Sequence, residues 1–251
     1  MLRNVCVKWA VVAFKKILSA VALAALVGCG GTTVPNAAHV RFFNGFSDRQ
    51  DVRAYFGDKL YSGGGVGPAI GFGNELAYGD SPSGSINIVA NPYIDPSTDW
   101  ATLASQTLFK DALYTVVGTT VGSTRTLFLF NDGVAQTAGN GYFRILNAAP
   151  TTSPVYVTLR RSSDDSIVYP SGTSTGSSTV GSSSGYRSIA VPSSDPVNFI
   201  LHVYATSDFT NSLSADIPVT LQQGTPTTVV LYNNTSGNVL ARSASDVALG
   251  G

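Results

Sequence analysis

One loop of the sequence gathers the side chains best suited to chemistry on a sugar. Tyr93 and Trp100 supply aromatic faces that stack on the apolar faces of sugar rings, and Asp95 and Asp99 supply carboxylates that accept hydrogen bonds from hydroxyls. Two carboxylates held about 5–10 Å apart would also equip a glycoside hydrolase. The favoured alternative is a turn fixed by Pro96, with Trp100 folded onto the body of the protein. These four side chains are the candidate ligand-contact loop.

Two histidines, His39 and His202, remain as candidates for catalysis outside the N-terminal segment. A serine nucleophile would need one of them as its base, and no Gly-x-Ser-x-Gly elbow occurs in a strand-to-helix context. Both fall in expected strands, so partly exposed sheet positions are the favoured interpretation. A zinc site would require two strands from different domains to converge. We therefore expect no catalytic residue, no metal ligand and no cofactor.

Four other polar segments carry weaker signals. The neighbouring carboxylates of Asp164–Asp165 are expected to point in different directions. Asn131–Gly133 lacks the alternating oxygen ligands of a calcium loop and is expected as a hairpin or interdomain turn. Ser62–Gly67 and Ser171–Gly185 have the composition of flexible linkers and lack the lysine of a phosphate-binding loop. A binding loop there is the alternative to a mobile loop without function.

The first 28 residues have the pattern of a secretory signal peptide, with four basic residues, no acidic one, and the apolar run Ile17–Val27. This run is too short to cross a bilayer, which takes about 20 apolar residues. The segment Leu26–Cys29 resembles a lipobox, in which the cysteine thiol receives diacylglycerol, the chain is cut before it, and the new amine is acylated, for example with palmitate. The alternative is an ordinary signal peptide that contains a cysteine. We expect an exported lipoprotein anchored through Cys29, and Gly30 favours the outer membrane, on its periplasmic or surface face.

Removal of residues 1–28 would change the charge balance. It would take four basic residues and no acidic one from totals of 15 each, leaving 11 against 15 and a net charge of about −4. Nucleic acid is therefore not an expected partner, since phosphate binding needs clustered cations. Cys6 would leave with the signal peptide and Cys29 would carry lipid. The mature chain would then have no disulfide, no thiol nucleophile and no cysteine metal site.

The remainder of the chain reads as two similar halves after a polar tether at 29–37. Its roughly 215 residues are enough for two domains, and low charge with many β-branched residues favours strands. Residues 39–44 match 142–147 at an offset of 103, and later matches fall at offsets of 110–113, as loop insertions in a duplicated domain produce. We expect an all-β protein with two tandem immunoglobulin-like antiparallel β-sandwiches, at 38–139 and 140–251, each able to fold alone.

Each half offers about seven short strands bounded by turn residues. Arg41 and Arg144 hold equivalent positions in the repeat. They would bridge the domains or pair with an acid, although exposed strand positions are the favoured interpretation. The expected strands lie near 39–44, 51–56, 69–77, 85–91, 102–108, 113–120 and 125–130, and near 142–147, 154–160, 166–169, 186–191, 197–205, 216–221, 226–233 and 238–242.

A strand of the type Val-Arg-Phe-Phe-Asn, a polar turn and second strand, a Pro-Ser-Gly corner and a Tyr-Thr-Val-Val run follow one another in the first half. Together they resemble the bacterial Domain of Unknown Function 4397. The resemblance implies an exported protein with the domain in tandem and without established catalytic residues. Asn44–Phe46 departs from the His-Ala-Ser-Pro-like turn usual in that family, whereas Asn147–Pro150 is closer to it. The segments that carry the resemblance are Val40–Asn44, Asp51–Phe56, Ser81–Ile88 and Leu113–Gly118, with weaker matches in Tyr142–Asn147, Pro154–Leu159 and Thr227–Tyr232.

The expected function rests on the kinds of site that the sequence lacks. The sequence carries no recognisable nucleophile, metal cluster or nucleotide loop, and sandwich domains commonly present loops for recognition. We expect a non-catalytic binding or scaffold module of the cell envelope whose partner is an envelope protein or a surface polysaccharide. The alternatives are an envelope glycan hydrolase that uses Asp95 and Asp99, and a purely structural envelope protein.

Overall fold

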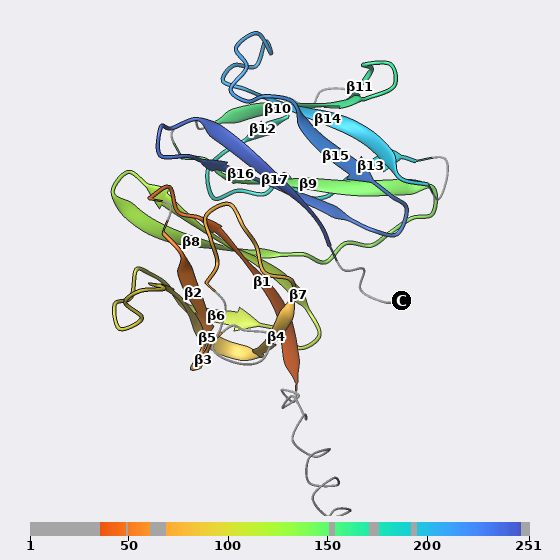
Figure 1. Ribbon diagram of the computed structural model, residues 1–251. Helices are drawn as coiled ribbons and strands as arrows, with labels where there is room; N and C mark the ends of the chain where they lie inside the picture. The colour runs from red at the N-terminus through yellow and green to blue at the C-terminus, as the bar shows by residue number, and fades with distance from the viewer. Residues whose placement is uncertain are drawn as a thin grey trace, which may run out of the picture. The chain divides into compact units, whose positions relative to one another are not determined.

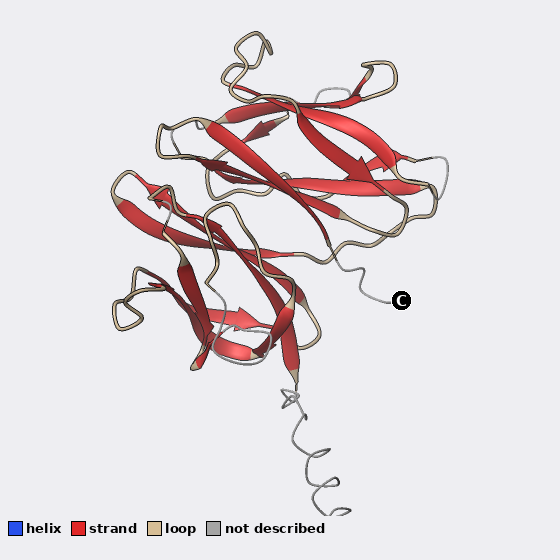
Figure 2. Cartoon of the chain, in the orientation of Figure 1, coloured by secondary structure: helices blue, strands red, loops and turns tan. Residues whose placement is uncertain are grey.

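The computed structural model describes residues 36–48, 50–60, 69–150, 154–170, 176–191 and 195–246. Strands are the only regular elements in these ranges, which confirms the expected all-β class (Figure 2). No helix in the described ranges is long and apolar enough to cross a membrane. The expected signal peptide, Cys29, most of the tether and the segment Ser62–Gly67 lie outside the described residues.

The first half is a sandwich of two four-stranded sheets, with strand orders β4-β1-β7-β8 and β3-β2-β5-β6 (Figure 1). Neighbouring strands are antiparallel except β1 and β7, which run parallel. The strands are β1 (Ala37–Gly45), β2 (Val52–Phe56), β3 (Lys59–Leu60), β4 (Gly79–Pro82), β5 (Gly84–Pro92), β6 (Ala101–Leu108), β7 (Leu113–Val121) and β8 (Thr124–Asn131).

The second half repeats this topology. Its sheets have the orders β13-β9-β16-β17 and β11-β10-β14-β15, with β12 added beside β10, and β9 and β16 are again parallel. Two tandem sandwiches are therefore confirmed, although the first strand of each half, β1 or β9, lies between β4 and β7 or between β13 and β16 rather than beside the second strand as in immunoglobulin domains. The strands are β9 (Asn140–Ala148), β10 (Val155–Arg161), β11 (Ile167–Tyr169), β12 (Ser177–Ser178), β13 (Arg187–Ala190), β14 (Val197–Tyr204), β15 (Ile217–Leu221), β16 (Thr227–Asn233) and β17 (Val239–Ser245).

Two expectations about the loops are wrong. Residues 69–77 form no strand, and within them Ile70 and Glu75 make only isolated bridges. The described part of Ser171–Gly185 lies along β9 instead of forming a free linker, because the Gly181 amide donates to the Asn147 carbonyl at 2.8 Å and the Ser184 amide donates to the Ile145 carbonyl at 2.9 Å. Backbone hydrogen bonds thus hold a segment whose composition indicated only flexibility.

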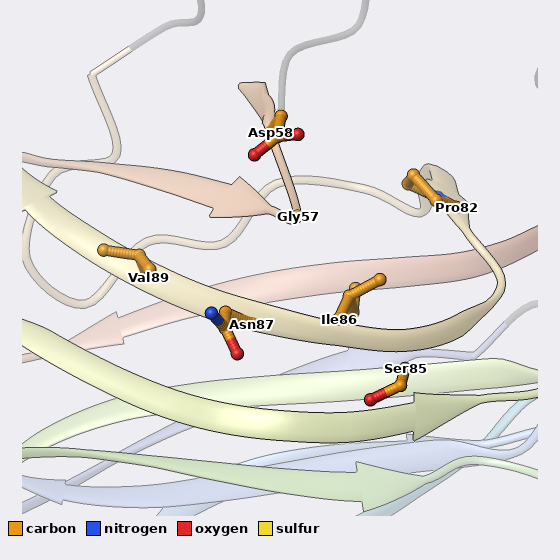
Figure 3. A pocket seen from close by; sticks show the side chains of 7 residues that line it. All are labelled: Gly57, Asp58, Pro82, Ser85, Ile86, Asn87 and Val89. Atoms are coloured by element: carbon orange, nitrogen blue, oxygen red, sulfur yellow. The ribbon is translucent and has the colours of Figure 1, made fainter.

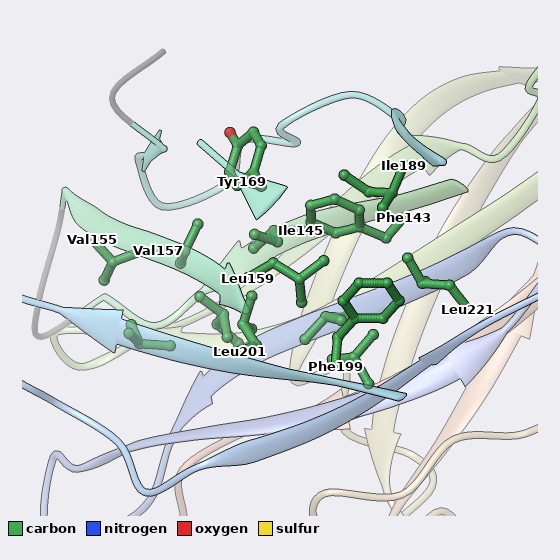
Figure 4. Packing of buried hydrophobic residues seen from close by; sticks show 14 of the residues in the cluster. Phe143, Ile145, Val155, Val157, Leu159, Tyr169, Ile189, Phe199, Leu201 and Leu221 are labelled. Atoms are coloured by element: carbon green, nitrogen blue, oxygen red, sulfur yellow. The ribbon is translucent and has the colours of Figure 1, made fainter. Parts of the chain in front are cut away.

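Alternation along the strands builds a hydrophobic core inside each sandwich. In β2, for example, Val52, Ala54 and Phe56 are buried while Arg53 and Tyr55 between them are partly exposed. The core of the second half brings residues of β9, β10 and β14 together, as Figure 4 shows for Phe143, Leu159 and Phe199 among others. Full burial of such a side chain stabilises the fold by about 1.5–3 kcal/mol.

The strands β1, β7, β9 and β16 depart from this alternation because both of their faces are buried. In β1, Val40 and Phe42 belong to the core of the first half, whereas Phe43 belongs to a third cluster that the two halves share. The halves accordingly belong to one compact unit. Independent folding of each half stays a prediction, and this shared core argues against it. The shared cluster consists of Phe43, Val117, Phe130, Leu146, Ala148, Val230 and Tyr232, with Phe72, Phe128 and Leu240 packed against it.

Candidate ligand-binding site

The structure does not bring the two aromatic residues of the candidate ligand-contact loop together. Trp100 packs against the core of the first half, in edge contact with Phe46 at 6.3 Å between ring centroids. The guanidinium of Arg125 lies over the Trp100 ring, 3.9 Å from its centroid, and therefore covers a face on which a sugar would stack. Tyr93 instead stacks with Arg53, whose guanidinium lies 4.5 Å from the Tyr93 ring centroid. Of these two rings, Tyr93 is the more accessible, with 37% of the residue exposed.

The carboxylates of this loop differ in their surroundings. Asp95 accepts hydrogen bonds from the Ser97 hydroxyl at 2.6 Å and the Thr98 hydroxyl at 2.8 Å. These bonds, that of Ser97 first, hold the pKa of Asp95 below its ordinary value. A glycosidase proton donor needs the opposite shift. Asp99 is exposed on the same loop. Asp95 therefore serves as the cap of its own turn.

Both histidines are partly exposed strand residues, as expected. His39 lies in β1 with its Nδ1 atom 3.0 Å from Asp80, and its side chain is 39% exposed. His202 lies in β14, where its ring stacks on Tyr204 and its Nδ1 atom is 3.4 Å from Asp216. No group of three or more histidine, cysteine or acidic side chains in the described ranges is placed to hold a metal ion.

Asp164 and Asp165 point apart, as expected. Asp164 accepts a hydrogen bond from the Ser166 hydroxyl at 2.6 Å, whereas Asp165 pairs with Arg160 at 2.9 Å. Neither geometry places two carboxylates on one substrate.

Arg144 is the first of two buried arginines whose expected exposure is wrong. Its side chain is 1% exposed and pairs with Asp132, the residue that follows β8 of the first half. The Arg144 Nε atom also donates to the Thr228 hydroxyl at 2.9 Å, and its Nη1 atom donates to the Asn131 carbonyl at 2.8 Å. The turn expected at Asn131–Gly133 thus supplies a charge partner to the other half.

Arg41 repeats this arrangement in the opposite direction. It is 3% exposed and pairs with Asp246, which follows β17 of the second half, while its Nε atom donates to the Thr115 hydroxyl at 2.7 Å. Arg41 lies opposite Thr115 in the parallel pair of the first half, as Arg144 lies opposite Thr228 in that of the second. Burial lowers the pKa of Arg41, but the summed charges around it, Asp246 first and Asp132 among the others, outweigh burial, so the pKa is raised.

Each of the two aspartates also accepts a hydrogen bond from a tyrosine. Tyr78 donates to Asp132, and Tyr186 donates to Asp246 at 2.6 Å. Burial first, and the nearby aspartates after it, raise the pKa of both tyrosines, so their hydroxyls stay protonated donors. We call these eight residues the buried polar cluster: Arg41, Tyr78, Thr115 and Asp132 from the first half, and Arg144, Tyr186, Thr228 and Asp246 from the second.

The buried polar cluster is a structural element and not a reaction site. Each charge is matched within it, and the arginines and aspartates are almost fully shielded from solvent. Sequence reasoning noticed the arginines but missed both aspartates, because each follows the last strand of its half and has no motif around it. Their repeat offset of 114, close to the 113 of the strands before them, was the signal that would have paired them.

Two grooves on the described surface have ligand-sized volumes. One of about 480 Å³ runs over β5 and the β2–β3 turn, where Figure 3 shows the Asp58 carboxylate above the strand and Ile86, Asn87 and Val89 along it. It belongs to the first half alone, and the Asn87 side chain already accepts a hydrogen bond from the Ser105 amide at 3.0 Å.

The second groove, of about 540 Å³, combines equivalent segments of both halves. The β7–β8 and β16–β17 hairpins form its walls, and Ser47 and Pro150, which follow the first strand of each half at an offset of 103, complete it. We call it the inter-hairpin groove. Its lining is neutral throughout and mostly polar: Ser47, Thr120, Val121, Gly122, Pro150, Asn233, Asn234, Thr235, Ser236 and Gly237.

The inter-hairpin groove has a firm frame and an unmatched group in its wall. The Thr119 hydroxyl donates to the Ala148 carbonyl across the two halves at 2.7 Å. The Asn234 side chain accepts the Ser236 and Asn238 amides at 2.9 Å, which fixes the β16–β17 turn. The Thr120 hydroxyl is shielded from water and has no hydrogen-bond partner among the described residues. Such an unmade bond costs about 1–3 kcal/mol, and because the hydroxyl is shielded from water it is closed to a ligand as well.

Comparison with known proteins identifies no family for this chain. No protein-family model matches it, and no curated protein matches it significantly. Among solved structures, a family 26 carbohydrate-binding module of Eubacterium rectale bound to maltoheptaose is similar at 11% identity and a TM-score of 0.29, over 84% of this chain and 98% of that one. Streptococcal family 41 modules that recognise α-glucan reach 10% identity and 0.26, over 79% and 98%. A cell adhesion protein of Bacteroides eggerthii reaches 8% and 0.20, over 87% and 98%. Likenesses this distant bear neither on strand order nor on ligand.

Proposed function

We propose that this chain is a non-catalytic lipoprotein of the cell envelope that binds an uncharged polysaccharide in the inter-hairpin groove. The observation that carries the proposal is the lining of that groove, which offers hydroxyls, amides and backbone groups from both halves and no charge. The four charged groups of the buried polar cluster are paired with one another, and Asp95 is held by its own turn.

The chemistry of the lining narrows the class of ligand. A charged ligand would lose its hydration without gaining a counter-ion, and an apolar ligand would leave polar wall groups unmatched. Sugar hydroxyls both donate and accept, so they complement serine and threonine hydroxyls and asparagine amides alike. An envelope protein, the other partner class expected from the sequence, would be detected as a stoichiometric companion after crosslinking in intact cells.

The rival hydrolase has less support. Asp95 is the cap of its turn, and its lowered pKa is the reverse of what a proton donor requires. Trp100, the aromatic residue meant to hold the sugar, is covered by Arg125 on one side and by the core on the other.

Binding is tested with variants of groove residues whose side chains do not hold the fold. Thr235→Ala combined with Ser236→Ala is expected to weaken binding about tenfold, since each hydrogen bond contributes about 0.5–1.5 kcal/mol and about 1.4 kcal/mol corresponds to a factor of ten. The measurement is calorimetric titration of the Cys29→Ser protein with neutral oligosaccharides, among them maltoheptaose, the ligand named for the Eubacterium rectale module.

The matched control is Thr102→Val on the exposed face of β6, which should leave affinity unchanged. Thermal unfolding separates binding from folding, because Thr235 and Ser236 are exposed turn residues whose substitution should change the melting temperature little. Equal affinities for the groove variant and the control would refute the groove as the site. Turnover of a glycan that disappears in an Asp95→Ala/Asp99→Ala protein would establish the hydrolase instead.

Anchoring is proposed from the sequence: the lipobox-like Leu26–Cys29 and the resemblance to exported tandem-domain proteins support it. In Cys29→Ala we expect an unprocessed precursor or a soluble protein, because the acyl chains have no attachment site. Membrane fractionation with labelled palmitate measures this, and Cys6→Ala is the control that should still be lipidated. A mature Cys29→Ala protein that remains fixed in the membrane would overturn the anchor.

A further inference from the structure

The surfaces that the two halves bury against each other carry the same groups. Each half supplies one arginine and one aspartate, and the arginine of either half pairs with the aspartate of the other. A surface that presents the same patch on both sides is isologous, the type found in two-fold symmetric homodimers. The chain therefore contains, within one molecule, the contacts of a symmetric dimer.

In the apolar part of this surface one glycine of each half recurs, although the aromatic residues that the two glycines contact are not equivalent in the repeat. Gly73 of the first half and Gly181 of the second have φ angles of +72° and +74° and hold equivalent positions. A Cβ atom at Gly73 would lie 2.8 Å from the Tyr232 hydroxyl, and one at Gly181 would lie 2.5 Å from the Phe128 ring. Each half thus offers a glycine that receives an aromatic side chain of the other.

The covalent connection between the halves does not contribute to this surface. After Asp132 it runs over Gly133–Gly139, and residues 135–138 are exposed. Gly139 adopts a φ of +84°, so the segment contains a glycine at a conformation that other residues rarely adopt. A different path through this segment would leave every contact of the interface intact.

We propose that a second copy of this chain is a partner for this surface: two chains exchange halves across residues 133–139 and form a closed two-fold dimer. Residues 36–132 of one chain then lie against residues 140–246 of the other, with Arg41 on the partner's Asp246 and Arg144 on the partner's Asp132. Because monomer and dimer share the same contacts, they differ mainly in the connecting segment, and chain concentration sets their ratio. This arrangement is a domain swap, in which two protomers exchange an identical element.

The test uses the Cys29→Ser chain with a site-specific protease sequence inserted between Gln136 and Thr137. The protein is unfolded, refolded over a hundredfold range of concentration, and sized by light scattering. We expect a dimer whose share rises with concentration and that persists on dilution. Cleavage of the inserted sequence should then convert it to particles of monomer mass, because only the connecting segments join the two units. Each particle should contain one fragment that ends at Gln136 and one that begins at Thr137.

The chain without the inserted sequence is the control, and its dimer should survive the protease unchanged. Monomer alone at every concentration would overturn the proposal, as would a dimer that keeps its mass after cleavage, since that dimer associates through another surface. If refolding yields no native protein, the natively produced protein is concentrated and sized before and after cleavage of the inserted sequence instead. A dimer that cleavage converts to monomer mass is expected, and monomer alone or a dimer that keeps its mass would refute exchange.

Discussion

Asp132→Ala is expected to lower the free energy of unfolding by about 3–5 kcal/mol, the cost of leaving a buried ion without its partner. The substitution leaves Arg144, which is 1% exposed, without a counter-ion, and it also removes the acceptor of Tyr78 and Thr115. Most single domains are stable by only about 5–15 kcal/mol. The measurement is urea-induced unfolding of the Cys29→Ser protein, with and without the substitution.

Two further variants identify the cause. Asp164→Ala removes an exposed carboxylate that caps its own turn and should change stability by less than about 0.5–1 kcal/mol. Arg144→Met together with Asp132→Leu removes both charges and should recover much of the loss, because replacing a buried pair with apolar residues is often neutral. If Asp132→Ala unfolds at the same urea concentration as Asp164→Ala, the buried polar cluster has no role in stability.

Neither residues 36–139 nor residues 140–251 is expected to give a stable monomer when expressed alone. Each half would expose the apolar cluster that it shares with the other, including Phe43 or Tyr232, and would hold one arginine without its aspartate. Expressed together, the two fragments should form a soluble one-to-one complex that unfolds cooperatively. Co-purification through a tag on one fragment, followed by thermal unfolding, measures this.

The outcome distinguishes two views of the repeat. A soluble monomer from either fragment, with a cooperative transition of its own, would mean that the cores inside the sandwiches suffice. The Asp132→Ala substitution in the first fragment provides the matched control, since it should abolish complex formation if the exchanged ion pairs hold the halves together.

Much of the fold could be predicted from the sequence because short runs of β-branched and aromatic residues are bounded by turn residues and recur in the two halves. The segments that match at an offset of 103, residues 39–44 and 142–147, became β1 and β9, and the boundaries of most strands fell within one or two residues. The failures have a physical cause. Strands β3, β4 and β12 are two to four residues long, and residues 69–77 contain apolar side chains that pack without pairing as a strand.

The candidate site was less predictable. Tyr93 and Trp100 are seven residues apart, yet they contact different partners. Tyr93 directly follows β5 and Trp100 directly precedes β6, so the position of each ring depends on the strand next to it. The inter-hairpin groove consists of turn residues such as Ser47, Thr120 and Thr235, which are common in loops and carry no spacing signal. Long-range pairs such as Arg41 and Asp246 become visible only in the folded structure, where the two halves pack against each other.

The pairing of Arg41 with Asp246 joins residues 205 positions apart. During synthesis the first strand is made early, whereas Asp246 is made after every other residue that the structure describes. A chain that stops short of residue 246 therefore leaves Arg41 with only Asp132, which lies 3.9 Å from its Nε atom and is already paired with Arg144. Two buried arginines would then share one aspartate, so we expect a truncated chain to be less stable than the complete one.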